Sequence, residues 1–167
     1  LMIAKLLSSY GYRIYIYEDY QSTIKGGHNF SLIRASKKRV LSSKEGIDFL
    51  LALNEDTAKR HSKKLGNSDN MAYNSDAFSS SKGVGVPIET ITADLGGIPI
   101  MKNTALVAAF AKMAGIDWST VKKVFKAELP IATEKNLEIA KEANGQIKTA
   151  AKIEKIKGER MPLVSGN

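Results

Sequence analysis

The chain of 167 residues has 25 basic and 17 acidic side chains, a formal net charge of +8, and a 43% share of hydrophobic residues. This length and composition are typical of one globular domain with its own core, and they exclude a disordered chain. The sequence contains no cysteine, which excludes disulfides, a cysteine nucleophile, and zinc or iron–sulfur ligation by thiolates of this chain.

The first part of the chain has strand signals after a short helix. Apolar residues at helical spacing in 1–10, followed by Gly11, indicate the end of an amphipathic helix. β-branched and aromatic residues at 12–17 and 30–35 predict two strands. The nearly continuous apolar run 47–53 is typical of a strand covered on both faces, as in a parallel sheet.

Helix and strand signals alternate in the middle of the chain. Residues 55–65 predict a helix, 70–74 a short strand, and 85–88 the start of a further extended segment. Breaks are expected at the low-complexity loop 79–85 and at 96–99. We therefore predict an α/β, Rossmann-like fold with a mostly parallel sheet of about five or six strands and helices on both faces.

The last part of the chain is helical. Three helices are predicted, at 101–115, from Asp117 onward, and at 133–144. The expected N-caps are Asp117 and Thr133, and the expected C-terminal stops are Gly115 and Gly145.

No apolar run reaches the ~18 residues that a membrane-spanning helix requires. The lack of cysteine permits a reducing cytoplasm, and we expect a soluble cytoplasmic protein with no membrane partner. The two histidines, His28 and His61, have no metal-ligand spacing, and we expect both at the surface or in loops.

The basic charge makes nucleic acid a candidate partner from a different class of function. Only 34–39 and 59–64 are dense in lysine and arginine, and no stacking aromatics interleave with them. Elsewhere lysines alternate with glutamates in helical register. A solvated basic surface is therefore favoured over a basic nucleic-acid-binding domain.

The segment 17–28, Tyr-Glu-Asp-Tyr-Gln-Ser-Thr-Ile-Lys-Gly-Gly-His, resembles the gamma-type domain of 2-oxoacid:ferredoxin oxidoreductases. In that family an aromatic-acidic pair ends one strand, and a basic-Gly-Gly-His turn leads into the next. Further ordered matches are the strand 31–36, the apolar strand 48–54, and Asn103 at the start of an alanine-rich helix. The ending 163–167, Leu-Val-Ser-Gly-Asn, is similar to the junction in fused gamma-alpha subunits and favours the N-terminal domain of such an alpha subunit.

The resemblance also implies a domain organisation, with a fold like domain III of pyruvate-ferredoxin oxidoreductase. Residues 1–157 would form the gamma-type catalytic domain, and 158–167 a linker into a thiamine diphosphate pyrimidine-binding domain that is absent from this sequence. Family members begin with a strand and a Gly-x-Gly-Gly-x-Gly turn, and we expect this part of the natural domain to precede residue 1. Such a turn binds phosphate at a helix N-terminus, so its absence here argues against nucleotide or coenzyme binding by this chain alone.

The implied activity is oxidative decarboxylation of a 2-oxoacid, such as pyruvate or 2-oxoglutarate, to acyl-CoA with electron transfer to ferredoxin. Thiamine diphosphate, Mg and iron–sulfur clusters are expected in the complete enzyme, with coenzyme A as co-substrate and no cofactor bound firmly by this chain. The implied partners are the remainder of the alpha subunit, the beta subunit and ferredoxin, and the isolated chain is expected to be inactive. A freestanding gamma subunit of a pyruvate or indolepyruvate oxidoreductase is the nearest alternative.

The resemblance suggests ligand or interface residues, but no catalytic residue and no metal ligand. Gly26 and Gly27 form either a turn with positive φ or a close approach of the backbone to a ligand or partner. Lys25 and His28, which flank these glycines, either contact a phosphate or carboxylate of coenzyme A or substrate, or lie in solvent. Glu18 and the adjacent Asp19 stand at a strand's carboxyl end, where α/β domains bind ligands, or are solvated. Asn103 is favoured as a helix cap. The expected ligand or interface residues are Glu18, Lys25, Gly26, Gly27, His28 and Asn103.

Overall fold

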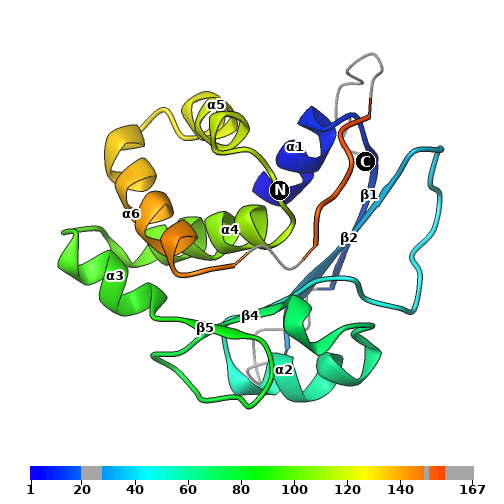
Figure 1. Ribbon diagram of the computed structural model, residues 1–167, viewed down its shortest axis with the longest axis horizontal. Helices are drawn as coiled ribbons and strands as arrows, with labels where there is room; N and C mark the ends of the chain where they lie inside the picture. Colours follow the sequence, from blue (N-terminus) through cyan, green and yellow to red (C-terminus); the bar gives the residue numbers. More distant parts are fainter. Residues whose placement is uncertain (20–27, 149–150, 157–167) are drawn as a thin grey trace.

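The structure, a computed structural model, describes residues 1–19, 28–148 and 151–156. It is an α/β fold in which helices pack on both faces of a three-stranded parallel sheet, with a two-stranded ribbon alongside (Figure 1). The helices are α1 (Met2–Ser9), α2 (Glu55–His61), α3 (Ile88–Asp94), α4 (Lys102–Met113), α5 (Trp118–Glu128) and α6 (Thr133–Gly145). The strands are β1 (Arg13–Asp19), β2 (Phe30–Ser36), β3 (Leu50–Ala52), β4 (Met71–Asn74) and β5 (Val84–Val86). The described residues also form the 3₁₀ turns η2 (Ser62–Lys64), η3 (Ser68–Asn70) and η4 (Pro99–Met101).

The parallel sheet has the strand order β3–β4–β5 and is covered on both faces. Alternation along the strands decides which residues face which helix. Leu50 and Met71 pack with Ala58 of α2 on one face. Leu51 and Ala72 pack on the opposite face, in the cluster that includes α3 and α4. This arrangement confirms the expectation of a parallel sheet covered on both faces.

The strands β1 and β2 form a separate antiparallel ribbon. Their pairing runs from Arg13 opposite Ser36 to Asp19 opposite Phe30. One face of the ribbon packs through Ile14 and Ile33 against the main hydrophobic core. Figure 1 shows the ribbon running from beside α1 toward α2. The end of the ribbon at Asp19 and Phe30 is thereby brought close to α2.

The main core lies between α1, α4, α5 and α6. Phe125, Leu6 and Val121 are fully buried there. The small side chains of α4, many of them alanine, allow α6 to pack closely along it, and Ala108, Ala109 and Ala140 have no exposed surface. Within the described residues, no helix has both the length and the apolar composition needed to cross a bilayer.

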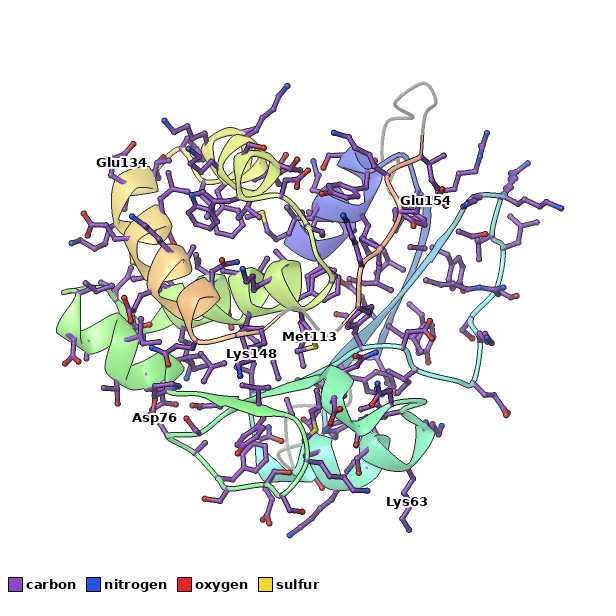
Figure 2. The ribbon with its side chains drawn as sticks, in the orientation of Figure 1. Lys63, Asp76, Met113, Glu134, Lys148 and Glu154 are labelled. Carbon is purple, nitrogen blue, oxygen red and sulfur yellow. The ribbon has the colours of Figure 1, made fainter. Side chains whose placement is uncertain are left out.

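Residues 151–156, named here the C-terminal strap, lie across the ends of two helices. The backbone N–H groups of Ala151 and Ile153 donate to the carbonyls of Met113 and Ala114, at 3.0 Å each. The N–H of Ile156 donates to the carbonyl of Tyr10 at 2.8 Å. The strap therefore satisfies carbonyls that α4 and α1 leave unpaired at their C-termini. Figure 2 places Glu154 in the strap beside the ribbon, and Lys37 at the end of β2 pairs with its carboxylate at 2.6 Å.

Most predicted elements are confirmed, and two differ in extent or type. The run 47–53 forms only the short strand β3, and Ile47 makes a separate isolated bridge to Leu65 before the strand begins. The extended segment expected at 85–88 ends at Val86, and α3 follows at once. Proline, whose ring fixes φ near the helical value, stands at the N-cap position Pro87.

The predicted single sheet of about five or six strands is wrong in its connectivity. The five strands of the described residues form two sheets, one parallel and one antiparallel. A sequence pattern reports that a segment is a strand and which face is apolar, but it does not report the partner strand. The ribbon strands therefore look like members of the main sheet from sequence alone.

Two of the predicted helix ends are wrong by one residue. Thr133 is the first residue of α6, and the N-cap is Ala132, with φ of 53°. The hydroxyl of Thr133 instead donates to the carbonyl of Leu129. Gly145 is the last residue of α6, whose C-cap is Gln146. The other two ends are confirmed: Gly115 follows α4, and Asp117 occupies the N-cap position of α5 without a side-chain hydrogen bond to the helix.

Candidate functional site

A surface hollow of about 230 Å³ opens where the ribbon meets α2. Tyr17 and Phe30 of the ribbon form one wall, and the centroids of their rings are 6.3 Å apart. The last residue of α2 and the following 3₁₀ turn form another wall through His61 and Lys64. The residues lining the hollow are Tyr17, Phe30, Leu32, Ser43, Lys44, Glu45, Ile47, His61 and Lys64.

Three side chains behind this wall are joined by polar contacts. His28, just before β2, has its Nδ1 atom 3.3 Å from Oδ2 of Asp56 on α2. Its Nε2 atom lies 2.9 Å from Nε2 of His61. The side chain of His28 is only 7% exposed. Phe30 lies beside both imidazoles, with ring centroids 5.5 Å from His28 and 5.0 Å from His61.

Positive charge surrounds His61. Burial lowers the pKa of His61, and the neighbouring His28, Lys64 and Arg60 lower it further, whereas Asp56 acts in the opposite direction. The carboxylate of Asp56 is shared, because Nε of Arg60 donates to the same Oδ2 atom at 2.7 Å. The hollow therefore has a neutral imidazole and cationic side chains beside aromatic rings at neutral pH.

The structure places the predicted site residues in three different surroundings. Glu18 is an exposed residue of β1, opposite Ser31 of β2. The expectation that Glu18 lies at a ligand-binding carboxyl edge is wrong, because β1 belongs to the antiparallel ribbon and not to the parallel sheet. His28 lies in a loop as expected, but its side chain is mostly buried rather than at the surface. The predicted residues Lys25, Gly26 and Gly27 lie outside the described residues.

Asn103 does not line the hollow and lies in the first turn of α4. It is not the cap that the sequence favours, because α4 begins at Lys102 and its N-cap is Met101. Asn103 instead lines a second groove of about 350 Å³ between α4, α5 and α6, which is largely apolar. A buried hydrogen bond from the hydroxyl of Thr104 to Oδ1 of Asn136, at 2.8 Å, crosses this groove between α4 and α6.

The second groove is bordered by exposed apolar side chains. Ile131 is 85% exposed, and Ile98 and Ile100 are also largely exposed. Exposed apolar surface gathered in one place is typical of protein interfaces. Together with Asn103, these residues mark a candidate interface separate from the hollow.

The carboxyl edge of the parallel sheet is occupied by a closed polar network. Nδ2 of the buried Asn74 donates to Oε1 of Glu89 at 3.1 Å, and Lys102 lies 3.6 Å from the same oxygen. Asp76, labelled in Figure 2 near the start of α3, accepts the backbone N–H groups of Glu89 and Thr90. These groups satisfy one another, so this edge holds α3 to the sheet.

Sequence reasoning missed Asp56 and His61. Both residues lie in a segment that reads as an exposed helix rich in charge, and Asp56 has an i,i+4 partner in Arg60. The only sequence signal was the presence of a second histidine, which gave no indication that the ribbon would bring His28 against it. Within 1–19, 28–148 and 151–156, no three histidine, aspartate or glutamate side chains are grouped so as to hold a metal ion.

Comparison with known proteins gives a family match over most of the chain. Residues 1–145 match a family model described as pyruvate ferredoxin/flavodoxin oxidoreductase. A 2-oxoacid:ferredoxin oxidoreductase subunit alpha from Sulfolobus sp. is 40% identical over 55 residues. That alignment spans 33% of this chain and 9% of the relative.

Two solved structures have a similar fold. The 2-oxoglutarate:ferredoxin oxidoreductase from Magnetococcus marinus, solved with 2-oxoglutarate, coenzyme A and succinyl-CoA bound, matches 93% of this chain with a TM-score of 0.76 and 17% identity. This chain covers 30% of that protein's chain. The gamma subunit of a keto/oxoacid ferredoxin oxidoreductase from Geobacter sulfurreducens PCA matches 87% of this chain, and 88% of its own, with a TM-score of 0.65 and 18% identity.

Proposed function

Because this chain belongs to the pyruvate ferredoxin/flavodoxin oxidoreductase family, we propose that it is the gamma-type domain of the alpha subunit of a 2-oxoacid:ferredoxin oxidoreductase. The observation that carries the proposal is the family match over residues 1–145. The similarity to an alpha subunit, and a fold shared with the Magnetococcus enzyme, support it. The complete enzyme would convert a 2-oxoacid to acyl-CoA and carbon dioxide, with electrons passing to ferredoxin.

The residues of this chain do not fit the redox cofactors of such an enzyme. The sequence has no cysteine, so the thiolates of an iron–sulfur cluster must come from other domains or subunits. The described residues also offer no three-ligand metal group. The contribution of this domain is therefore binding and positioning, with the remainder of the alpha subunit, a beta subunit and ferredoxin as partners.

The hollow between the ribbon and α2 has the chemistry to contact coenzyme A. The rings of Tyr17 and Phe30 offer apolar surface to a heteroaromatic ring, and the ammonium groups of Lys44 and Lys64 can pair with phosphates. The Magnetococcus enzyme, part of whose fold this chain shares, was solved with coenzyme A bound, which supports coenzyme A as the co-substrate.

A freestanding gamma subunit is the second candidate. It is favoured by one observation, because 87% of this chain matches the fold of the Geobacter gamma subunit, with a TM-score of 0.65. The two candidates share the reaction and differ only in whether the domain is fused to the alpha subunit. The sequence encoded immediately after Asn167 distinguishes them.

Kinetics of the assembled enzyme test the proposal. Purified together with its co-encoded partner subunits, the natural polypeptide should reduce a viologen dye in the presence of a 2-oxoacid and coenzyme A. Lys44→Ala with Lys64→Ala should raise KM for coenzyme A about tenfold, the effect of losing about 1.4 kcal/mol of binding, while KM for the 2-oxoacid stays unchanged. The control is Lys123→Ala, on the exposed face of α5.

Two outcomes contradict different parts of the proposal. Viologen reduction that no 2-oxoacid supports would overturn the proposed activity. Normal activity with an unchanged KM for coenzyme A in the double variant would overturn only the assignment of the hollow. The isolated chain of 167 residues should show no turnover in the same assay.

A further inference from the structure

Asp56, His28 and His61 form one line of polar contacts that the proposed activity does not use. The contact between the two imidazoles joins the entrance of β2 to the C-terminal end of α2. The ring centroids are 5.1 Å apart while the two Nε2 atoms are 2.9 Å apart. The rings therefore meet edge to edge, nitrogen facing nitrogen, rather than stacking face to face.

A nitrogen–nitrogen distance of 2.9 Å requires one proton between the two rings. A neutral imidazole has one N–H donor and one bare acceptor nitrogen. The carboxylate of Asp56 can only accept, so it favours the tautomer in which His28 has its proton on Nδ1. The Nε2 atom of His28 is then the acceptor, and Nε2 of His61 is the donor.

We propose that Asp56, His28 and His61 form a proton-sharing clasp that ties β2 to α2 at neutral pH and opens in acid. A first added proton leaves the clasp intact, because Nδ1 of His61 can take it without disturbing the N–H between the rings. A second added proton places an N–H on both facing atoms and two positive charges in contact. The hydrogen bond between the rings is then lost.

The charged groups around the clasp set the pH at which it opens. Arg60 on α2 and Lys64 on the following turn oppose protonation, and Asp56 favours it. Lys44, Glu45 and Tyr17 line the same hollow as His61. The clasp opens only when both imidazoles are charged, and burial and the neighbouring cations lower the pKa of His61, so opening should require a pH below the ordinary histidine pKa of about 6.5.

Opening of the clasp has a structural consequence for the hollow. Phe30 lies beside both imidazoles and also forms a wall of the hollow. Separation of the rings would therefore displace this wall. The clasp itself depends only on contacts within this chain, so it can be tested independently of the proposed enzyme activity.

A metal ion between the rings is the competing explanation. Two Zn–N bonds of about 2.0–2.1 Å in a tetrahedral site hold the nitrogens about 3.3 Å apart, with both lone pairs converging on the ion. The 2.9 Å separation and the edge-to-edge facing of the rings match a hydrogen bond instead. The two explanations predict different responses to Zn²⁺.

Nitrogen NMR of the 167-residue chain, labelled at histidine, tests the clasp directly. At pH above about 7 we expect His28 protonated on Nδ1, His61 protonated on Nε2, and a scalar coupling between the two Nε2 nuclei across the hydrogen bond. The coupling should persist while only one imidazole is charged and vanish reversibly at lower pH, where both imidazoles are charged, while the chain stays folded. Absence of the coupling at every pH would overturn the proposal.

Variants distinguish the clasp from a merely packed pair of rings. Asp56→Asn should shift His28 toward a mixture of tautomers, and His61→Phe should remove the coupling and the acid transition. The matched control is Glu55→Gln, which removes an exposed charge paired with Lys59 on the same helix and should leave both signals unchanged. Equal effects of the two carboxylate variants, or stoichiometric Zn²⁺ binding that shifts both imidazoles at neutral pH, would overturn the proposal.

Discussion

Tyr10 and Gly11 stand where α1 ends, and the C-terminal strap crosses the chain there. Tyr10 is 3% exposed, and its hydroxyl accepts the backbone N–H of Asp117 at 2.7 Å. Burial raises the pKa of Tyr10, the hydrogen bond from the backbone N–H of Asp117 opposes this, and the side chain of Asp117 raises the pKa further. Lys155 of the strap lies over its ring at 5.6 Å from the centroid. One residue thus joins α1, the start of α5 and the strap.

Gly11 has no room for a side chain at this junction, and substitution there should be costly. Its φ is 89°, and an added Cβ would lie 2.6 Å from the carbonyl oxygen of Ile156. Gly96 is the matched control, because its φ is also positive, 65°, but a Cβ there meets nothing within 4 Å. We expect Gly96→Ala to lower the free energy of unfolding by about 1 kcal/mol through backbone strain alone. Gly11→Ala should cost at least about 2 kcal/mol, because overpacking against the strap adds to the strain.

Urea denaturation of both variants measures these differences. Hydrogen exchange of the Ile156 amide provides a local readout, because displacement of the strap should expose it selectively in Gly11→Ala. Equal destabilisation by the two substitutions would show that overpacking against the strap adds nothing to the cost of Gly11→Ala.

The Gly-Gly-His motif shows the limit of residue-level prediction. The sequence identified His28 as a site residue because a family resemblance directed attention to it. It could not identify Asp56 or His61 as its partners, because their contact depends on how the ribbon lies against α2. Residue types and spacing predict local chemistry, whereas the pairing of side chains from distant segments is decided by packing.

At the scale of elements, α3 is a short helix whose N-terminus is capped by the carboxylate of Asp76, a residue outside the helix. Asp76 accepts hydrogen bonds from the backbone N–H groups of Glu89 and Thr90, at 2.7 and 3.0 Å, and from the hydroxyl of Thr90 at 2.8 Å. The N-cap residue Pro87 makes no side-chain hydrogen bond to the helix. The carboxylate therefore satisfies donors that α3 would leave unpaired.

Asp76→Ala should lower the free energy of unfolding by about 1–2 kcal/mol at neutral pH, as loss of a helix cap does. The control is Asp94→Ala at the other end of the same helix, where a carboxylate is exposed and opposes the helix dipole. We expect a change within about 0.5 kcal/mol for the control. Urea denaturation measures both, and equal effects would contradict the capping role.

Acid titration adds a second check on Asp76. Burial opposes its ionisation, but the hydrogen bonds from Thr90 and Glu89 outweigh burial and lower the pKa of Asp76. The unfolded carboxyl, with a pKa of about 3.9, therefore takes up a proton before the folded one does as the pH falls. The stabilisation is complete well above about pH 4 and is lost below it. Asp76→Ala should lack this part of the acid dependence.

The elements differ in how far the sequence predicts them. Segments with a strong pattern, such as α4 with its alanine-rich face or β1 with its isoleucines and tyrosines, are confirmed within one or two residues. α3 was missed because the segment after Val86 begins with proline and has only seven helical residues, too few for a clear period. The division of five strands into two sheets was missed because pairing depends on contacts between strands.

At the scale of the whole molecule, the strap closes the fold. Its N–H groups bind the C-terminal carbonyls of α4 and α1, and Ile153 packs on the main core. The side chain of Lys37 at the end of the ribbon reaches Glu154, which raises the pKa of the lysine and lowers that of the glutamate. The strap thus connects the helical layer to the ribbon, which forms a sheet separate from the parallel sheet that the helices cover.

The distribution of charge decides between the enzyme domain and the alternative of a nucleic-acid-binding domain. Much of the two dense basic segments is engaged within the chain. Lys59 pairs with Glu55 at 2.8 Å, Arg60 with Asp56 at 2.7 Å, and Lys37 with Glu154 at 2.6 Å. In addition, Arg34 donates to the carbonyl of Ser42 at 3.0 Å. A net charge of +8 therefore corresponds to a dispersed basic surface rather than to a row of cations available for phosphates.

We expect the chain to bind nucleic acid only weakly, with a Kd above about 1 μM at roughly 150 mM salt, as is typical of non-specific binding. A site that neutralises six or more phosphates would lose about three to five decades of affinity between about 50 and 200 mM salt, starting from tight binding. Fluorescence anisotropy with labelled duplex DNA and single-stranded RNA, repeated across this salt range, measures both quantities. Because internal pairing withholds Arg60 from phosphate, Arg60→Gln should leave the weak affinity unchanged. Submicromolar binding with a steep salt dependence, lowered by that variant, would favour the nucleic-acid-binding domain.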